Sequence, residues 1–119
     1  MSDLASETLL ETFANSRPDR PFKIEFTFSE FTSLCPITSQ PDFGTIIVRY
    51  VPGLRCVELR SLKLYFQAYR SMGIFFEGVM NKILDDLVAV CDPLEMTIIG
   101  RFNVRGGVAH EFTASHPTE

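Results

Sequence analysis

The fold is decided by residues 59–93, which read LRSLKLYFQAYRSMGIFFEGVMNKILDDLVAVCDP. Apolar side chains first recur at three- and four-residue spacing, the mark of an amphipathic helix, at Leu59, Leu62, Phe66 and Tyr69. Gly73 is expected to break this helix. A second helical stripe follows over residues 79–91 and ends at Asp92-Pro93. The middle of the chain therefore predicts two consecutive helices.

Two strand patterns precede the helical pair. Residues 22–29 alternate apolar and polar side chains, which is the period of a half-buried strand. Residues 45–51 are rich in β-branched side chains and predict a second strand. The residues between them, which include Cys35 and Asp42, are expected to form a loop.

Two further strand patterns follow the helices. Alternation resumes over residues 96–104, with Gly100 as an expected bulge, and again over residues 108–112. Gly106-Gly107 permits a sharp turn between them. The order strand, strand, helix, helix, strand, strand predicts an α+β fold, in which a four-stranded antiparallel sheet carries both helices on one face.

Length and composition fit a single globular domain. The chain has 119 residues, of which 45% are hydrophobic and 22% charged. Prolines and alternating charge near Arg20 predict a flexible N-terminal segment over residues 1–20. Residues 21–119 then form one domain, whose tail is expected to fray from Ala114 onward. A core of this size is modest, so assembly into an oligomer would supplement it.

Charge and cysteine usage restrict the partners and the compartment. The net charge of −4 argues against broad nucleic-acid binding. The odd cysteine count leaves at least one unpaired thiol and does not suggest a secreted disulfide framework. The acidic N-terminus lacks the features of a signal peptide, and no apolar stretch approaches membrane-spanning length. We expect a cytoplasmic protein with no membrane partner.

Cys35 and Asp42 form the most informative chemical pair in the sequence. A thiolate can attack an electrophilic carbon, and a nearby carboxyl can supply a proton. Each residue also has a plain structural interpretation, because free cysteines are commonly buried and an aspartate after Pro41 can form a turn. Their joint presence in a loop between two strands favours the catalytic interpretation.

Four stretches together resemble one family of enzymes. They are Ser33-Leu34-Cys35-Pro36 with Gln40-Pro41-Asp42-Phe43, Glu58–Tyr65, Phe75-Phe76-Glu77, and Asn103–Gly107. In this order and spacing they resemble the single-module NADPH-dependent nitrile reductases of queuosine biosynthesis, the QueF type, which have the tunnelling fold. The resemblance covers roughly residues 21–113.

The resemblance implies a reaction and its catalytic residues. This family reduces 7-cyano-7-deazaguanine to 7-aminomethyl-7-deazaguanine and consumes two NADPH. Cys35 would add to the nitrile carbon and form a covalent thioimide, with Asp42 as the general acid/base. Arg60, Lys63 and Arg105 would bind the phosphates of NADPH. The alternative interpretation is that these three residues are ordinary surface cations.

The resemblance also implies substrate contacts from Val57, Glu58, Leu59, Phe76 and Glu77. A glutamate carboxylate can accept from both the ring N–H and the exocyclic amine of a guanine-like edge. Some family members carry histidine at the position of Phe76, whereas phenylalanine can only stack on a flat heterocycle. We expect no catalytic histidine, because the two histidines lie near the end of the chain.

Assembly is also implied by the resemblance. Tunnelling-fold proteins assemble into a barrel with active sites at subunit interfaces, and the reductases stack two such rings. We therefore expect a homo-oligomer that acts on a small 7-deazaguanine, with no direct nucleic-acid partner.

Three other functions remain open at the level of sequence. One is an amidinotransferase that acts on the same nitrile in tRNA. Enzymes of that kind lack the cofactor segment, so the intact Glu58–Tyr65 stretch argues against this function. Another is a zinc enzyme like the GTP cyclohydrolases, although the cysteines and histidines form no metal motif, so we expect no metal site. The last is a non-catalytic purine-binding module.

Overall fold

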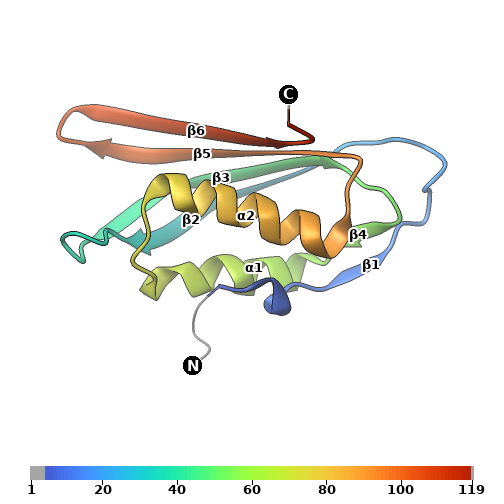
Figure 1. Ribbon diagram of the computed structural model, residues 1–119, viewed down its shortest axis with the longest axis horizontal. Coiled ribbons are helices and arrows are strands. Elements are labelled where there is room, and N and C mark those ends of the chain that lie inside the picture. The colour runs from blue at the N-terminus through green and yellow to red at the C-terminus, as the bar shows by residue number, and fades with distance from the viewer. Residues whose placement is uncertain (1–4, 119) are drawn as a thin grey trace.

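In the computed structural model, which describes residues 5–118, a four-stranded antiparallel sheet carries both helices on one face (Figure 1). The sheet has the strand order β2-β3-β5-β6. Its strands are β2 (Ile24–Leu34), β3 (Pro41–Val51), β5 (Glu95–Arg105) and β6 (Val108–His116). The helices are α1 (Leu59–Gln67) and α2 (Phe76–Cys91). The predicted α+β architecture is confirmed.

The hydrophobic core lies between the sheet and the two helices. Ile46 and Ile98 point from the sheet and are fully buried against Ile83 and Leu87 of α2, which are fully buried as well. Burial of apolar surface is worth about 25 cal/mol per Å² and is the main force that holds this layer pair together. The helical stripes in the sequence therefore face the sheet.

Each helix ends where its local chemistry requires. Glu58 precedes α1, and its carboxylate accepts hydrogen bonds from the backbone N–H of Ser61 (2.7 Å) and of Arg60 (3.0 Å), which satisfies the helix start. A 3₁₀ turn, η2 (Ala68–Ser71), follows α1. After α2, Asp92 adopts a left-handed conformation with φ of 46°.

No helix within residues 5–118 is long and apolar enough to cross a bilayer.

A second, two-stranded sheet departs from the sequence prediction. β1 (Thr12–Ala14) pairs with β4 (Arg55–Val57), and a 3₁₀ turn, η1 (Glu7–Leu9), precedes it. Ala5 and Leu10 are buried in the core. The sequence predicts only a flexible segment here, because three-residue strands are too short to show alternation. Residues 1–4 of that segment lie outside the described residues.

Gly100 is not a bulge, contrary to the sequence prediction. It pairs in regular register with Ile46 on one side and Phe112 on the other. A β-carbon at this position would overlap Sδ of Met80 on α2. Glycine therefore leaves room for the Met80 side chain, which would have to shift to make space for a β-carbon.

The strands run further than the sequence predicts. β2 continues to Leu34 and β3 begins at Pro41, so only residues 35–40 form the connection. Asp42 consequently lies within a strand and not in a loop. β6 continues through His116, past the predicted onset of fraying, because its last residues pair with the start of β5.

Candidate functional site

Cys35 lies in a tight turn that connects β2 and β3. Its N–H donates to the carbonyl of Gln40 (2.9 Å), and its carbonyl accepts from the N–H of Ser39 (2.8 Å). Ser39 takes the left-handed conformation, with φ of 62°, that closes the turn. Cys35 is therefore held on a rigid connection between two long strands.

The turn also adjusts the acidity of the Cys35 thiol. Backbone and side-chain hydrogen bonds from Thr38, with a further backbone hydrogen bond from Ile37, hold the pKa of Cys35 below its ordinary value. The positive charge of Arg105 acts in the same direction with a smaller effect. Because the thiolate is the nucleophilic form, this turn favours reactivity.

The segment before α2 is attached beside Cys35 by backbone pairing. The N–H of Leu34 donates to the carbonyl of Met72 (2.9 Å), and the N–H of Ile74 donates to the carbonyl of Leu34 (3.1 Å). These hydrogen bonds form a short parallel bridge. They place the first residues of α2, Phe76 and Glu77, next to the turn that holds Cys35.

Asp42 enters the site from β3 and is almost fully buried, with 6% exposure. Its Oδ1 is ion-paired with the guanidinium of Arg105, which comes from the end of β5. An ion pair of this kind satisfies a buried carboxylate, which would otherwise be costly to remove from water. The β2–β3 and β5–β6 hairpins are therefore joined at the site by their charges.

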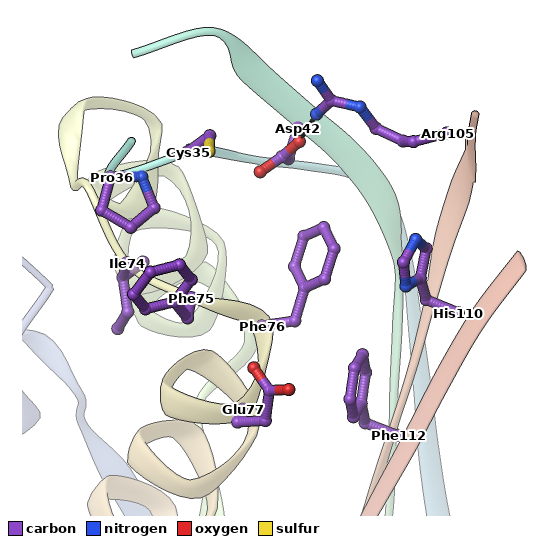
Figure 2. Close-up of a pocket in the computed structure, with 10 residues that line it drawn as sticks. All are labelled: Cys35, Pro36, Asp42, Ile74, Phe75, Phe76, Glu77, Arg105, His110 and Phe112. Carbon is purple, nitrogen blue, oxygen red and sulfur yellow. Dashed lines mark hydrogen bonds and ion pairs between the residues drawn. The ribbon is translucent and has the colours of Figure 1, made fainter. Parts of the chain in front are cut away.

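These residues surround one cleft of about 330 Å³ (Figure 2). The cleft brings together half of the predicted site residues: Cys35, Asp42, Phe76, Glu77 and Arg105. Its volume is in the range that small-molecule sites occupy. The ring of Phe76 stacks on Phe102 at 4.0 Å between centroids, which fixes an aromatic wall.

The sequence interpretation missed several residues of this cleft. Pro36 lines it from the turn that holds Cys35, and Ile74 and Phe75 line it from the segment before α2. His110 and Phe112 line it from β6. His110 lies far along the chain, but the β5–β6 hairpin folds it back to the site. The alternation over residues 108–112 already put 110 and 112 on one face, and this signal could have identified them.

The remaining predicted substrate residues lie elsewhere in the same chain. Val57 belongs to β4, is buried, and donates its N–H to the hydroxyl of Tyr50 (2.9 Å). Glu58 and Leu59 stand at the start of α1, next to β4 and at the opposite end of the molecule from the turn at Cys35 (Figure 1). The structure therefore does not bring these three residues to the cleft of their own chain.

The two candidate glutamates differ in their hydrogen bonding. Both carboxylate oxygens of Glu58 accept from the start of α1, and these hydrogen bonds hold its pKa below the ordinary value. Among residues 5–118, the carboxylate of Glu77 accepts no hydrogen bond and makes no ion pair. Glu77 is therefore the carboxylate available to a ligand in the cleft.

The predicted cofactor cations also divide into two groups. Arg60 and Lys63 are exposed on α1 and form no ion pair with any residue in the described part of the chain. Arg105 is already paired with Asp42 inside the cleft. No group of three or more potential metal-binding side chains occurs within residues 5–118.

Comparison with known proteins identifies similar sequences along nearly the whole chain. Residues 41–119 match the family model described as QueF-like protein. Proteins named NADPH-dependent 7-cyano-7-deazaguanine reductase are similar in Chlorobium phaeobacteroides (51% identity, 92% of this chain and 94% of the relative) and Chloroherpeton thalassium (53%, 93% and 96%). The Anaeromyxobacter sp. (strain K) protein of the same name is 53% identical over 90% of this chain and 88% of its own length.

A solved structure supports the fold. It is described as the archaeosine synthase QueF-Like in the apo form, and it matches with a TM-score of 0.70 over 80% of this chain and 91% of that chain. The sequence identity is 21%, so the likeness concerns the fold alone. It agrees with the tunnelling fold that the sequence predicts.

Proposed function

The chain belongs to the QueF-like family, and from that membership we propose that it is an NADPH-dependent 7-cyano-7-deazaguanine reductase of queuosine biosynthesis. The product is 7-aminomethyl-7-deazaguanine. One observation carries the proposal, which is that Cys35, Asp42 and Glu77 converge in a single cleft of suitable size. A nucleophile, a proton carrier and a guanine-binding carboxylate are the three groups that this reaction requires.

Cys35 and Asp42 act together on the nitrile. Attack by Sγ of Cys35 forms a carbon–sulfur bond and removes one π bond between carbon and nitrogen, which gives a thioimide. Asp42, held as a carboxylate by Arg105, takes the thiol proton and passes it to the nitrile nitrogen. The carbon–sulfur bond breaks later and releases Cys35 as a thiolate.

Glu77 and Phe76 hold the heterocycle. The free carboxylate of Glu77 accepts from the ring N–H and the exocyclic amine of the deazaguanine, and this charge-assisted pair selects guanine-like rings. The ring of Phe76, fixed by its stacking on Phe102, offers an apolar face. These contacts orient the nitrile toward Cys35.

Arg60 and Lys63 suit a phosphorylated cofactor because they are exposed, unpaired within residues 5–118 and three positions apart on α1. Arg105 adds a third charge at the cleft itself. When bound, NADPH supplies the two hydrides that the nitrile carbon requires. The protein contributes the orientation of the substrate and the covalent handle.

The complete site forms between subunits of a homo-oligomer. The segment that contains Val57, Glu58 and Leu59 lies at the opposite end of the folded molecule from the cleft (Figure 1). A second copy of the protein must therefore supply these residues if they contact the same substrate. We expect two stacked rings of subunits, with no nucleic-acid or membrane partner. The free thiols of all three cysteines support a reducing, cytoplasmic location.

The reaction is tested by its stoichiometry. Purified protein with 7-cyano-7-deazaguanine is expected to oxidise two NADPH per amine formed, because a nitrile needs two hydrides to become an amine. Loss of NADPH absorbance and mass analysis of the product measure this ratio. Amidine formation on nitrile-bearing tRNA without NADPH, or binding without oxidation, would contradict the reductase.

Subunit sharing is tested by mixing two inactive variants. Cys35→Ala removes the nucleophile, and Glu58→Gln keeps a capping oxygen but removes the charge from the predicted substrate contact. Mixed oligomers are expected to recover up to about a quarter of wild-type activity, because random pairing joins two intact halves at that frequency. NADPH oxidation after co-refolding measures the recovery.

A matched control mixes Cys35→Ala with Asp42→Asn. These two residues line the same cleft of one chain, so no mixed site can be complete and no activity should return. Full activity of Glu58→Gln alone would assign Glu58 to helix capping only. A lack of recovery in the first mixture would speak against a shared site.

A further inference from the structure

His110 lies in the wall of the cleft on the side away from Cys35 (Figure 2). It projects from β6, where its register partner on β5 is Phe102. Its ring meets Phe76 edge-on, at 5.3 Å between centroids and 61° between planes. It also lies nearly parallel to Phe112, at 6.5 Å and 14°. Two aromatic neighbours therefore fix the orientation of the imidazole.

The hydrogen-bonding capacity of His110 is unused within residues 5–118. No described group hydrogen-bonds to its ring, and it takes part in no ion pair there. Its aromatic neighbours can offer no partner, and Arg105 is paired with Asp42 instead. A neutral imidazole carries one donor and one acceptor, so the half-buried ring presents polar capacity to the cleft.

The deazaguanine ring has an edge to which no residue of the same chain has yet been assigned. Glu77 accounts for N1–H and the 2-amino group, and Cys35 accounts for the nitrile on C7. The carbonyl O6 lies between those two positions on the ring, whereas N3 and N9–H lie on the far side. Burial of such groups without a hydrogen bond is unfavourable.

We propose that His110 is a substrate-binding residue that hydrogen-bonds the N3/N9–H edge of the deazaguanine, which adjoins the 2-amino group held by Glu77. This inference rests on the proposed function and adds a specificity determinant to the same site. Glu77 and His110 together form hydrogen bonds to two neighbouring edges of the ring, while Phe76 lies against its face. These contacts keep the nitrile directed at Cys35.

The test compares binding and turnover of His110→Phe, which preserves the aromatic packing and removes the hydrogen bond. In a Cys35→Ala background, calorimetry is expected to show 7-cyano-7-deazaguanine binding about 10-fold more weakly, with NADPH binding unchanged. In the otherwise native protein, KM for the nitrile should rise about 10-fold while kcat stays within about twofold. His110→Gln should recover part of the affinity.

A substrate analogue and a matched histidine sharpen the test. N9-methylation should weaken binding to the protein with His110 by about 10-fold and affect His110→Phe much less. His116→Phe, outside the cleft, should behave as wild type. Unchanged nitrile affinity in His110→Phe, or a fall in kcat alone, would overturn the role of His110 and leave the reductase intact. Wild-type protein that neither binds nor reduces the nitrile would overturn both proposals.

Discussion

Replacement of Cys35 by alanine is expected to lower kcat for nitrile reduction by at least about 10⁴-fold, because no other group on the described chain can form the thioimide. Mass analysis of wild-type protein with the nitrile, in the absence of NADPH, should reveal a covalent adduct that the variant lacks. The folded state should be unaffected, since Cys35 lies in an exposed turn and not in the core.

The environment of the thiol adds a pH signature. Hydrogen bonds from Thr38 and Ile37 stabilise the thiolate, so the pKa of Cys35 lies below its ordinary value and the nucleophile persists as the pH falls. Alkylation by iodoacetamide should therefore follow a lower apparent pKa than that of a free cysteine. Burial instead raises the pKa of Cys56, and raises that of Cys91 to about 12.

These two buried thiols provide the control. Cys56→Ala should keep its turnover, and alkylation of the native protein should modify Cys35 alone, because Cys56 and Cys91 are 5% and 1% exposed. Appreciable reduction by Cys35→Ala would rule out the covalent route. Alkylation of Cys35 only at the pH of an ordinary thiol would contradict the role of the turn.

The sequence predicts the main layer of the fold because its elements are long and periodic. The stripes that become α1 and α2, and the alternation of β2, are strong local signals. The small β1–β4 sheet is invisible to such reasoning, since its pairing joins three-residue segments from distant parts of the chain. Gly100 shows the same limit, because the side chain that occupies the space beside it belongs to Met80 on a helix.

The site is predicted in part for a similar reason. Cys35 and Asp42 are close in sequence and remain close in the fold, and backbone pairing at Leu34 brings Glu77 to them. The family motif predicts the same role, substrate binding, for Glu58 and Glu77. The fold shows that the two residues lie at opposite ends of one folded subunit. A pattern along the sequence cannot show which residues must come from another subunit.

Asp42→Asn is expected to lower kcat by about 10²- to 10⁴-fold, the usual contribution of a positioned general acid/base. Asparagine has the same shape, so the 6%-exposed site can accommodate it, but its amide cannot carry the proton from thiol to nitrogen. Affinity for the nitrile should change only severalfold, because Glu77 and not Asp42 is assigned to the guanine edge. Single-turnover adduct formation without NADPH, followed by mass analysis, isolates this step.

The ion pair with Arg105 requires its own control, because Asp42→Asn breaks it as well. Arg105→Gln breaks the same pair from the other side and leaves the carboxylate in place. The Arg105 side chain is 45% exposed, but its loss leaves the buried Asp42 carboxylate without its ion-pair partner. Arg105→Gln should therefore lower the free energy of unfolding, and the two variants are compared at a temperature where thermal unfolding curves show both to be folded. If proton transfer is the role of Asp42, adduct formation should fall far more in Asp42→Asn than in Arg105→Gln, whose main defect should be a higher KM for NADPH. Equal losses would mean that the geometry of the pair, and not the proton on Asp42, limits attack by Cys35.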